Sequence, residues 1–328
     1  MKRKIIAVLT LIMLCFSLTA CSSDNTSSPE SYPPGPILYE AADSDGDTIW
    51  LFGSIHSGMD YFYPLPDYIM NAFNKSEALA VEMTVRSTEG KTAQEIYGNL
   101  IYSDNSTIDE HIYKDTYDAA VQLLTNYGIY KPEMDRYKPV VWSMIIENKQ
   151  AEEAGVSSEL GVDRHLESCA VESKKEIIEI EGLQAQTDLL ASLSDEIQES
   201  LLINSVSNLP IEGEEEVLLD LWYNGDEEEL INYIAPGNGQ TEDDSSANGE
   251  YHKVMVTDRN IRMTQFAEKA LSDGKKVFIC VGAAHVLGKG GIVDRLSEKG
   301  YTITRIFDEE SEGFEDYEDL GEIDFIVQ

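Results

Sequence analysis

Short apolar runs alternate with longer stretches of mixed polarity from Ile37 to about Phe307, and the two patterns predict different elements. Runs rich in β-branched and aromatic residues predict strands at residues 37–41, 48–52, 78–83, 177–179, 276–281 and 302–306. Apolar residues spaced three and four apart predict helices at residues 65–75, 114–127, 139–154, 161–173, 184–192, 195–206 and 292–299. Alternation of this kind is typical of an α/β or α+β domain. We therefore expect a single domain over residues 37–307, with a large helical layer.

Two of the predicted strands are apolar at nearly every position, Ile49 to Phe52 and Val277 to Val281. Such runs are typical of strands that are covered on both faces, as in a parallel sheet. In α/β folds, binding and catalytic sites lie at the carboxyl ends of parallel strands. The sequence therefore predicts a central, mostly parallel sheet with a functional site at that edge.

The same motif follows both of these strands. Gly53-Ser54-Ile55-His56 follows the first, Gly282-Ala283-Ala284-His285 follows the second, and a helix and another strand come after each. This quasi-repeated strand–Gly-x-x-His–helix–strand unit brings both imidazoles to one edge if the two strands are neighbours. We expect Gly53 and Gly282 to let the backbone leave each strand at an angle that other residues tolerate poorly.

A carboxylate joins the two imidazoles. Glu82 follows the apolar run Ala78–Val81, where a charged group needs a partner. Two imidazoles and a carboxylate can bind a divalent ion such as Mn, Co or Zn and leave positions open for water. We predict a metal site formed by His56, Glu82 and His285, with Glu82 alternatively acting as general base. One histidine after a strand is more often structural, but two in equivalent contexts favour a site. The other histidines lack this context and are expected at the surface or in packing (His111, His165 and His252).

Composition and short motifs exclude several classes of protein. The chain carries 24 basic and 61 acidic residues, for a formal net charge of −37, so electrostatic attraction to a phosphate backbone is excluded and no nucleic-acid partner is expected. The sequence contains no His-Glu-x-x-His motif, which excludes the common zinc-protease helix. It also contains no Gly-x-Ser-x-Gly motif, so nothing supports a serine hydrolase.

Residues 1–20 have the features of a secretion signal, with Lys2-Arg3-Lys4, an apolar run and small residues before Cys21. This junction resembles the lipobox of bacterial lipoproteins. We therefore expect a diacylglycerol thioether on Cys21 that anchors the exported chain to the outer face of the cell membrane. An ordinary signal with an incidental cysteine is the alternative. Residues 21–36, rich in Ser and Pro, are predicted to be a disordered tether.

Two later segments are polar or acidic. Residues 236–250 are expected to form a surface loop, and residues 308–328 an acidic C-terminal tail that is solvated. Cys169 and Cys280 both lie among apolar neighbours. They either form a disulfide or serve as small buried hydrophobes, and the sequence leaves both alternatives open.

Several motifs, taken in order, resemble the TraB/GumN family over about residues 37–306. They are Leu51-Phe52-Gly53-Ser54-Ile55-His56, Tyr63-Pro64-Leu65-Pro66, Val81-Glu82, Gly161-Val162-Asp163, Ile180-Glu181-Gly182, Asp258-Arg259-Asn260, Met263, Val281-Gly282-Ala283-Ala284-His285 and Gly300-Tyr301. The resemblance implies an α/β fold like that of the erythromycin esterase (EreA) and ChaN haem-binding proteins, with both Gly-x-x-His motifs at the site. By this likeness His56, Glu82 and His285 are functional residues.

Arg259 and Asn260 also match the family, and the resemblance makes them catalytic candidates. An arginine beside a bound metal can hold a substrate carboxylate or a developing oxyanion, and an asparagine can orient either. The alternative is that both residues anchor the helical layer to the sheet.

The eukaryotic relatives in this family include the Tiki proteases, membrane-anchored metalloproteases that cut Wnt proteins. The resemblance therefore implies a metal-dependent hydrolase, in the first place a peptidase acting on a peptide or protein substrate. The alternative is a non-catalytic surface lipoprotein that binds a peptide or small ligand. Haem binding by the two histidines is a third option.

Overall fold

The computed structural model describes residues 35–207, 214–234 and 247–307. The strands within these residues are β1 (Leu38–Ala42), β2 (Thr48–Ser54), β3 (Ala78–Val81), β4 (Glu176–Glu179), β5 (Val277–Gly282) and β6 (Thr302–Ile306). They form one sheet in the order β4-β3-β5-β2-β1-β6. Strands β4, β3, β5 and β2 pair in parallel, and β1 pairs antiparallel with both β2 and β6. The predicted α/β fold with a mostly parallel sheet is confirmed.

The burial of each strand follows its sequence. Every residue of β3 and β5 and all but the first of β2 are buried, because these apolar runs lie in the centre of the sheet with both faces covered. The edge strands β4 and β6 keep exposed positions. Phe52 and Phe73 both pack against Phe278, each with ring centroids 5.8 Å apart. Each fully buried aromatic side chain contributes about 1.5–3 kcal/mol, so this centre is the rigid part of the fold.

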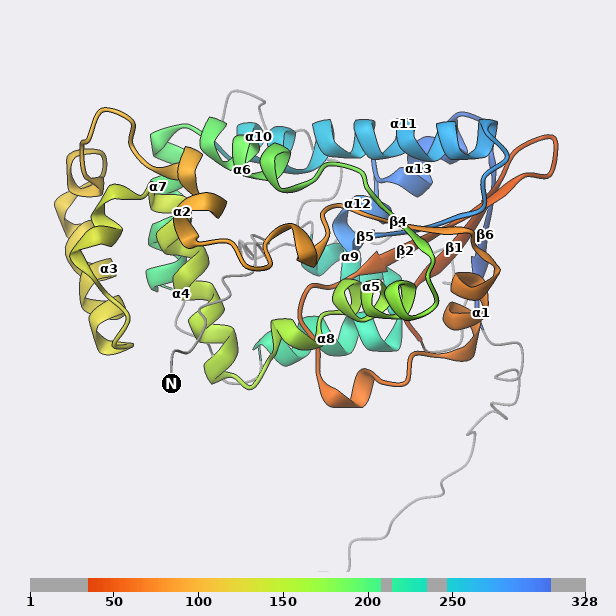
Figure 1. Cartoon of the computed structure of the whole chain (residues 1–328), viewed down its shortest axis with the longest axis horizontal. Coiled ribbons are helices and arrows are strands. Elements are labelled where there is room, and N and C mark those ends of the chain that lie inside the picture. Colours follow the sequence, from red (N-terminus) through yellow and green to blue (C-terminus); the bar gives the residue numbers. More distant parts are fainter. Residues whose placement is uncertain (1–34, 208–213, 235–246, 308–328) are drawn as a thin grey trace, which may run out of the picture.

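Helices cover both faces of the sheet and form a separate lobe at one end. The helices are α1 (Asp67–Lys75), α2 (Ala93–Ile96), α3 (Lys114–Asn126), α4 (Pro139–Glu153), α5 (Val162–Glu172), α6 (Leu183–Ser192), α7 (Asp195–Ser207), α8 (Glu214–Asn224), α9 (Glu227–Ile234), α10 (Ala247–His252), α11 (Asp258–Ser272), α12 (Ala283–Val286) and α13 (Ile292–Glu298). Shorter 3₁₀ turns are η1 (Asp60–Phe62), η2 (Val85–Ser87), η3 (Gly98–Leu100), η4 (Ile108–Glu110), η5 (Pro132–Arg136) and η6 (Ser158–Leu160), and η7 (Lys253–Thr257) is a π-helical turn. Figure 1 shows α11 and α13 on one side of the sheet, α5 and α8 on the other, and α3, α4 and α7 in the lobe.

The lobe is built around α4. Pro139 occupies the first turn of this helix, where its missing N–H costs nothing. The helix is apolar around most of its circumference because it contacts two clusters at once. Met144 belongs to one cluster, and Trp142 and Ile146 belong to the other. The predicted helical layer is therefore a lobe with its own apolar clusters beside the sheet.

The quasi-repeat is present as predicted. Strand β2 leads through His56 and α1 to β3, and β5 leads through His285 and α13 to β6. Strands β2 and β5 are parallel neighbours, with Ser54 opposite Gly282. Strand β3 lies on the other side of β5. The carboxyl ends of three neighbouring strands therefore meet at one edge of the sheet.

Two expectations from the sequence were wrong in detail. Gly282 has φ −51° and ψ 140°, and neither it nor Gly53 has a positive φ, so the backbone angle does not require glycine at either position. Space requires it instead: a Cβ on Gly53 would lie 3.1 Å from the Ala283 Cα. Part of the predicted loop 236–250 is helical, because α10 begins at Ala247.

The remaining predictions concern residues outside the described part of the chain. These are the signal at residues 1–20, the lipidation of Cys21, nearly all of the tether and the acidic tail. Among the described residues, none of the helices has both the length and the apolar character needed to cross a membrane. Cys169 and Cys280 are both free thiols.

Candidate functional site

The edge where β2, β5 and β3 end brings the three predicted residues together. His56 follows β2 by two residues, Glu82 follows β3 directly, and His285 lies in α12, which begins where β5 ends. A Cβ placed on Gly282 would lie 3.3 Å from Glu82 Oε1, 3.7 Å from His285 Cδ2 and 3.9 Å from His56 Nε2. One point thus lies within 4 Å of all three side chains. The absent side chain of Gly282 leaves the space in which they converge.

Glu82 is buried, with 7% of its surface exposed, and both of its oxygens accept hydrogen bonds. Its Oε1 accepts from the Gly282 backbone N–H at 2.8 Å, and its Oε2 accepts from Arg259 at 2.5 Å and from Gln186 at 3.2 Å. Burial alone would raise the pKa of this carboxyl, but the Arg259 guanidinium and the two histidines outweigh it and hold the pKa well below its usual range. Glu82 is therefore a fixed negative charge at the centre of the site.

The guanidinium N–H groups of Arg259 donate hydrogen bonds to other groups of the protein. It lies in the first turn of α11, where it is 7% exposed. Besides Glu82, it donates to Glu181 through Nη2 at 2.8 Å and to the Met255 carbonyl through Nη1 at 3.2 Å. Burial lowers the pKa of Arg259, and the two carboxylates reverse this and raise it further. These contacts tie α11 to the sheet edge, which is the anchoring alternative that the sequence left open.

The Nδ1 atoms of the two imidazoles have different partners. His56 Nδ1 lies 3.1 Å from Asp163 Oδ2, and His285 Nδ1 lies 2.7 Å from Asn260 Oδ1. Asp163 comes from α5, whereas Asn260 comes from α11. Both contacts use the nitrogen that faces away from Glu82, and His285 Nε2 lies 3.9 Å from Glu82 Oε1. Each imidazole is thus held from behind by a helix.

The two histidines have opposite pKa shifts, with different causes. Partial burial lowers the pKa of His56, but the Asp163 carboxylate, with a further contribution from Glu82, raises it to about 9. Burial lowers the pKa of His285 to about 3, and the Arg259 guanidinium acts in the same direction. In the absence of a metal, one imidazole is therefore cationic at neutral pH and the other is neutral.

The donor set fits a divalent cation, with one rearrangement. The neutral His285 Nε2 and the Glu82 carboxylate are both acceptors, and 3.9 Å separates them. Two ligand atoms of a tetrahedral zinc ion are about 3.4 Å apart, so a small contraction would let both bind one ion. Within the described ranges, His, Cys, Asp and Glu side chains form no ready-made metal group of three. The rearrangement involves Glu82 Oε1, whereas the ion pair with Arg259 is on the other oxygen, Oε2. His285 is the better-prepared histidine, because His56 would have to lose a proton.

Three further residues complete the site, and the sequence gives little or no indication of them. Asp163 was considered only as a weak family match, although it contacts His56. Glu181 belongs to a quoted motif, but nothing in that motif shows that it pairs with Arg259. Gln186 lies on α6 within an ordinary amphipathic pattern, and no sequence signal distinguishes it. An acid two residues after the end of β4 and directly before a glycine was the one available clue to Glu181.

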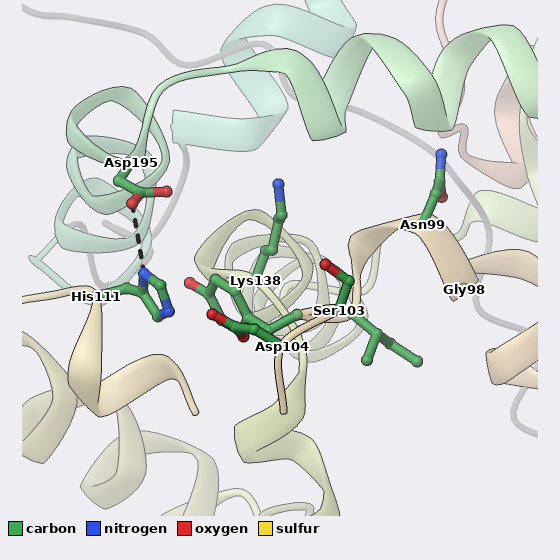
Figure 2. Close-up of a pocket in the computed structure, with 9 residues that line it drawn as sticks. Gly98, Asn99, Ser103, Asp104, His111, Lys138 and Asp195 are labelled. Atoms are coloured by element: carbon green, nitrogen blue, oxygen red, sulfur yellow. Dashed lines mark ion pairs between the residues drawn. The ribbon is translucent and has the colours of Figure 1, made fainter. Parts of the chain in front are cut away.

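The other histidines lie outside this cluster. His165 packs on Tyr63, with ring centroids 4.3 Å apart, and His252 is exposed. His111 stacks on Tyr102 and lies 3.5 Å from Asp195. Figure 2 shows His111 at a pocket of about 400 Å³ in the helical lobe. The pocket is lined by Gly98, Asn99, Ile101, Tyr102, Ser103, Asp104, His111, Lys138 and Asp195.

Fold and site together define an α/β protein with paired histidines and a carboxylate at the carboxyl edge of a parallel sheet. The chain belongs to the TraB/PrgY/gumN family, whose model matches residues 37–305. It is similar to the uncharacterized protein YbaP of Escherichia coli (strain K12), with 24% identity over 251 residues that cover 75% of this chain and 86% of YbaP. YbaP of Shigella flexneri matches with the same identity and coverage. No solved structure shows a significant match.

Proposed function

We propose that this protein is a metal-dependent hydrolase, in the first place a peptidase, tethered by Cys21 to the outer face of the cell membrane. One observation carries the proposal: two imidazoles from equivalent strand ends converge with Glu82 on a single point beside Gly282. Imidazole nitrogen is a common ligand of catalytic divalent ions, and a two-histidine, one-carboxylate set leaves positions for substrate and water.

In this proposal His56 and His285 hold the ion through their Nε2 atoms. A divalent ion bound there would polarise a carbonyl group and lower the pKa of water toward neutrality. Arg259 and the Gly282 N–H both stabilise the anionic form of Glu82 and hold its pKa well below the usual range, which makes Glu82 a weak base. This favours Glu82 as an anionic ligand over Glu82 as general base. Arg259 fixes the orientation of that carboxylate.

The nature of the substrate is supported by family resemblance rather than by the geometry of the site. The Tiki relatives cleave protein chains, and an outward-facing tether would present the site to extracellular peptides. Mn, Co and Zn each suit a site of imidazole and carboxylate ligands.

The test uses the soluble chain from Ser22 onward, loaded in turn with Mn²⁺, Co²⁺ or Zn²⁺. Bound metal is measured by elemental analysis, and cleavage is measured by incubating catalytic amounts with a peptide library, with and without chelator. The expected result is that His56→Ala and His285→Ala abolish both bound metal and cleavage, whereas the matched control His252→Ala changes neither. Unchanged metal content in both site variants would refute the proposal.

A second function, capture of a peptide or small ligand without turnover, has one observation in its favour. Among the described residues, Glu82 is already paired with Arg259 and Gly282, and His, Cys, Asp and Glu side chains form no ready metal group of three. A binding protein would protect a peptide mixture in proportion to its own amount. An enzyme would consume an excess of peptide, so the dependence on protein concentration separates the two functions.

A further inference from the structure

We propose that Asn260 and Asp163 are positioning residues that fix which nitrogen of each site imidazole faces the ligand. This inference rests on the proposed metal site. It concerns two side chains that do not themselves reach the ion. Asn260 holds His285 from α11, and Asp163 holds His56 from α5.

The orientation of the Asn260 amide determines the tautomer of His285. Asn260 is 2% exposed, and its Nδ2 donates to the Gly290 carbonyl at 3.0 Å. A carbonyl can only accept, so the amide nitrogen must face Gly290 and the amide oxygen must face His285. An amide oxygen can also only accept, so His285 Nδ1 must carry the proton in the contact of 2.7 Å. The neutral imidazole therefore has its lone pair on Nε2, on the side of Glu82.

Asp163 achieves the same result for His56 by a different route. The amino end of α5 docks on the backbone that carries His56, because Val162 N–H donates to the Ile55 carbonyl at 3.0 Å. Gly161 lies so close that a Cβ there would be 2.4 Å from the His56 carbonyl oxygen. This contact places Asp163, in the first turn of the helix, behind the imidazole at 3.1 Å. A carboxylate can only accept, so His56 Nδ1 also donates and Nε2 is directed to the site.

The two contacts together direct the Nε2 atoms of both imidazoles to the site before any ion arrives. Histidines that bind metals usually donate their second ring N–H to a carboxylate or carbonyl oxygen, which fixes the tautomer and the ring orientation. Removing such a partner typically costs about 10–100-fold in metal affinity. The geometry therefore assigns Asn260 a role through His285.

The test of this inference begins with the metal-free protein, labelled with ¹⁵N-histidine. Two-bond ¹H–¹⁵N correlation spectra report which ring nitrogen of His285 is protonated. The expected wild-type result is protonated Nδ1 and unprotonated Nε2. Asn260→Leu keeps the side-chain size, but it removes the acceptor and should mix or reverse the tautomer. Asn260→Asp restores an acceptor and should restore the wild-type pattern.

Arg295→Gln is the matched control, because Arg295 Nε donates at 2.8 Å to the same Gly290 carbonyl without contacting His285. It disturbs the same loop and should leave the tautomer unchanged. Metal affinity, measured by titration calorimetry with Zn²⁺, should fall by about 10–100-fold in Asn260→Leu and in Asp163→Leu. It should stay near the wild-type value in Arg295→Gln.

A protonated Nε2 in the wild-type protein would overturn the inference without any variant having to fold. So would an unchanged tautomer in Asn260→Leu. The outcome is also separable from that of the proposed function. A wild-type chain with the expected tautomer and no affinity for divalent ions would refute the metal site and leave the positioning role in place.

Discussion

The two Gly-x-x-His units share a sequence motif and a backbone path but differ in electrostatic environment. His56 keeps 21% of its side chain exposed and contacts a carboxylate, whereas the His285 side chain is 7% exposed and contacts a neutral amide. The pKa of His56 is consequently raised to about 9, and that of His285 is lowered to about 3. A repeated motif thus sets where an imidazole lies, while its burial and the charged groups around it set its charge.

This difference matters for a shared ligand. An ion that binds both Nε2 atoms must displace a proton from His56 but none from His285. His285 is therefore ready to bind an ion, whereas His56 must first lose its proton.

The largest expected effect comes from removing the cation that acts on both units. Arg259→Met leaves the buried Glu82 without its arginine and Glu181 with the more exposed Arg262 as its remaining ion-pair partner, so the free energy of unfolding should fall by about 3–5 kcal/mol. It should also raise the pKa of both histidines, since Arg259 lowers each. Urea unfolding and NMR titration measure the two effects. Arg262→Met is the control, because Arg262 is 45% exposed and should cost less than about 1 kcal/mol. Equal losses in the two variants would contradict this account of Arg259.

The next effect comes from removing the carboxylate charge that raises the pKa of His56. Asp163→Asn keeps an acceptor but removes the charge, so the pKa of His56 should fall from about 9 to near or below its ordinary value of 6.5. Because folding raises this pKa, the stabilisation is fully present below pH 6.5 and is lost as the pH rises through 9. Wild type should therefore exceed Asp163→Asn in unfolding free energy by about 2 kcal/mol near pH 6, and the gap should close by about pH 10. A gap that widens with pH would show the assigned cause to be wrong.

His285 should give a smaller pH dependence of stability, with the opposite sign to that of His56. Folding lowers its pKa to about 3, so the unfolded chain takes up a proton below pH 6.5 that the folded chain does not. Its contribution to stability is complete above pH 6.5 and falls as the pH drops toward 3. Between pH 6.5 and 5.5 wild type should lose about 1 kcal/mol more than His285→Gln. Parallel curves for the two proteins over this range would exclude a neutral buried His285.

Much of the fold could be predicted from the sequence because hydrophobic periodicity directly reflects burial. The apolar runs ending at Phe52, Val81 and Val281 mark central strands, and each of these is buried in the structure. Predicted strand ends differ by a residue or two, as where β3 ends at Val81. The chain turns there because the Glu82 carbonyl accepts from Glu181 and Gly182 beyond the end of β4.

The site could be predicted only in part. Residues that follow directly after central strands can be placed from the strand alone, which is why His56, Glu82 and His285 were found. Asp163 and Gln186 reach the site from helices, and their positions depend on how those helices dock, which periodicity does not encode. Arg259 was found by family resemblance, but its partners Glu82 and Glu181 are 177 and 78 residues away along the chain. The sequence left substrate contact and anchoring both open for Arg259, and the structure shows the contacts that tie α11 to the sheet edge.

The smallest effects concern the glycines of the two Gly-x-x-His units, Gly53 and Gly282, which are required for different reasons. Neither glycine has a positive φ, so alanine can adopt the native backbone at both positions. Because alanine reduces the conformational entropy of the unfolded chain, each substitution should by itself stabilise the fold by about 0.4–1 kcal/mol, which offsets part of any crowding. At Gly53 the new Cβ would meet the Ala283 Cα at 3.1 Å and its Cβ at 3.3 Å, on backbone that cannot move aside. Gly53→Ala should therefore lower the unfolding free energy by up to about 1 kcal/mol and leave metal affinity unchanged.

At Gly282 the Cβ would meet Glu82 Oε1 at 3.3 Å and would enter the space shared with both imidazoles. A side-chain carboxylate can shift by a few tenths of an ångström, so stability should change less than in Gly53→Ala. The added methyl group would instead occupy the space between the proposed ligands, so Gly282→Ala should weaken divalent-ion binding by roughly tenfold. Calorimetric unfolding and metal titration of the two variants should thus rank them in opposite orders. The same ranking in both measurements would mean that the space beside Gly282 serves packing alone, and that the convergence of the three side chains does not depend on it.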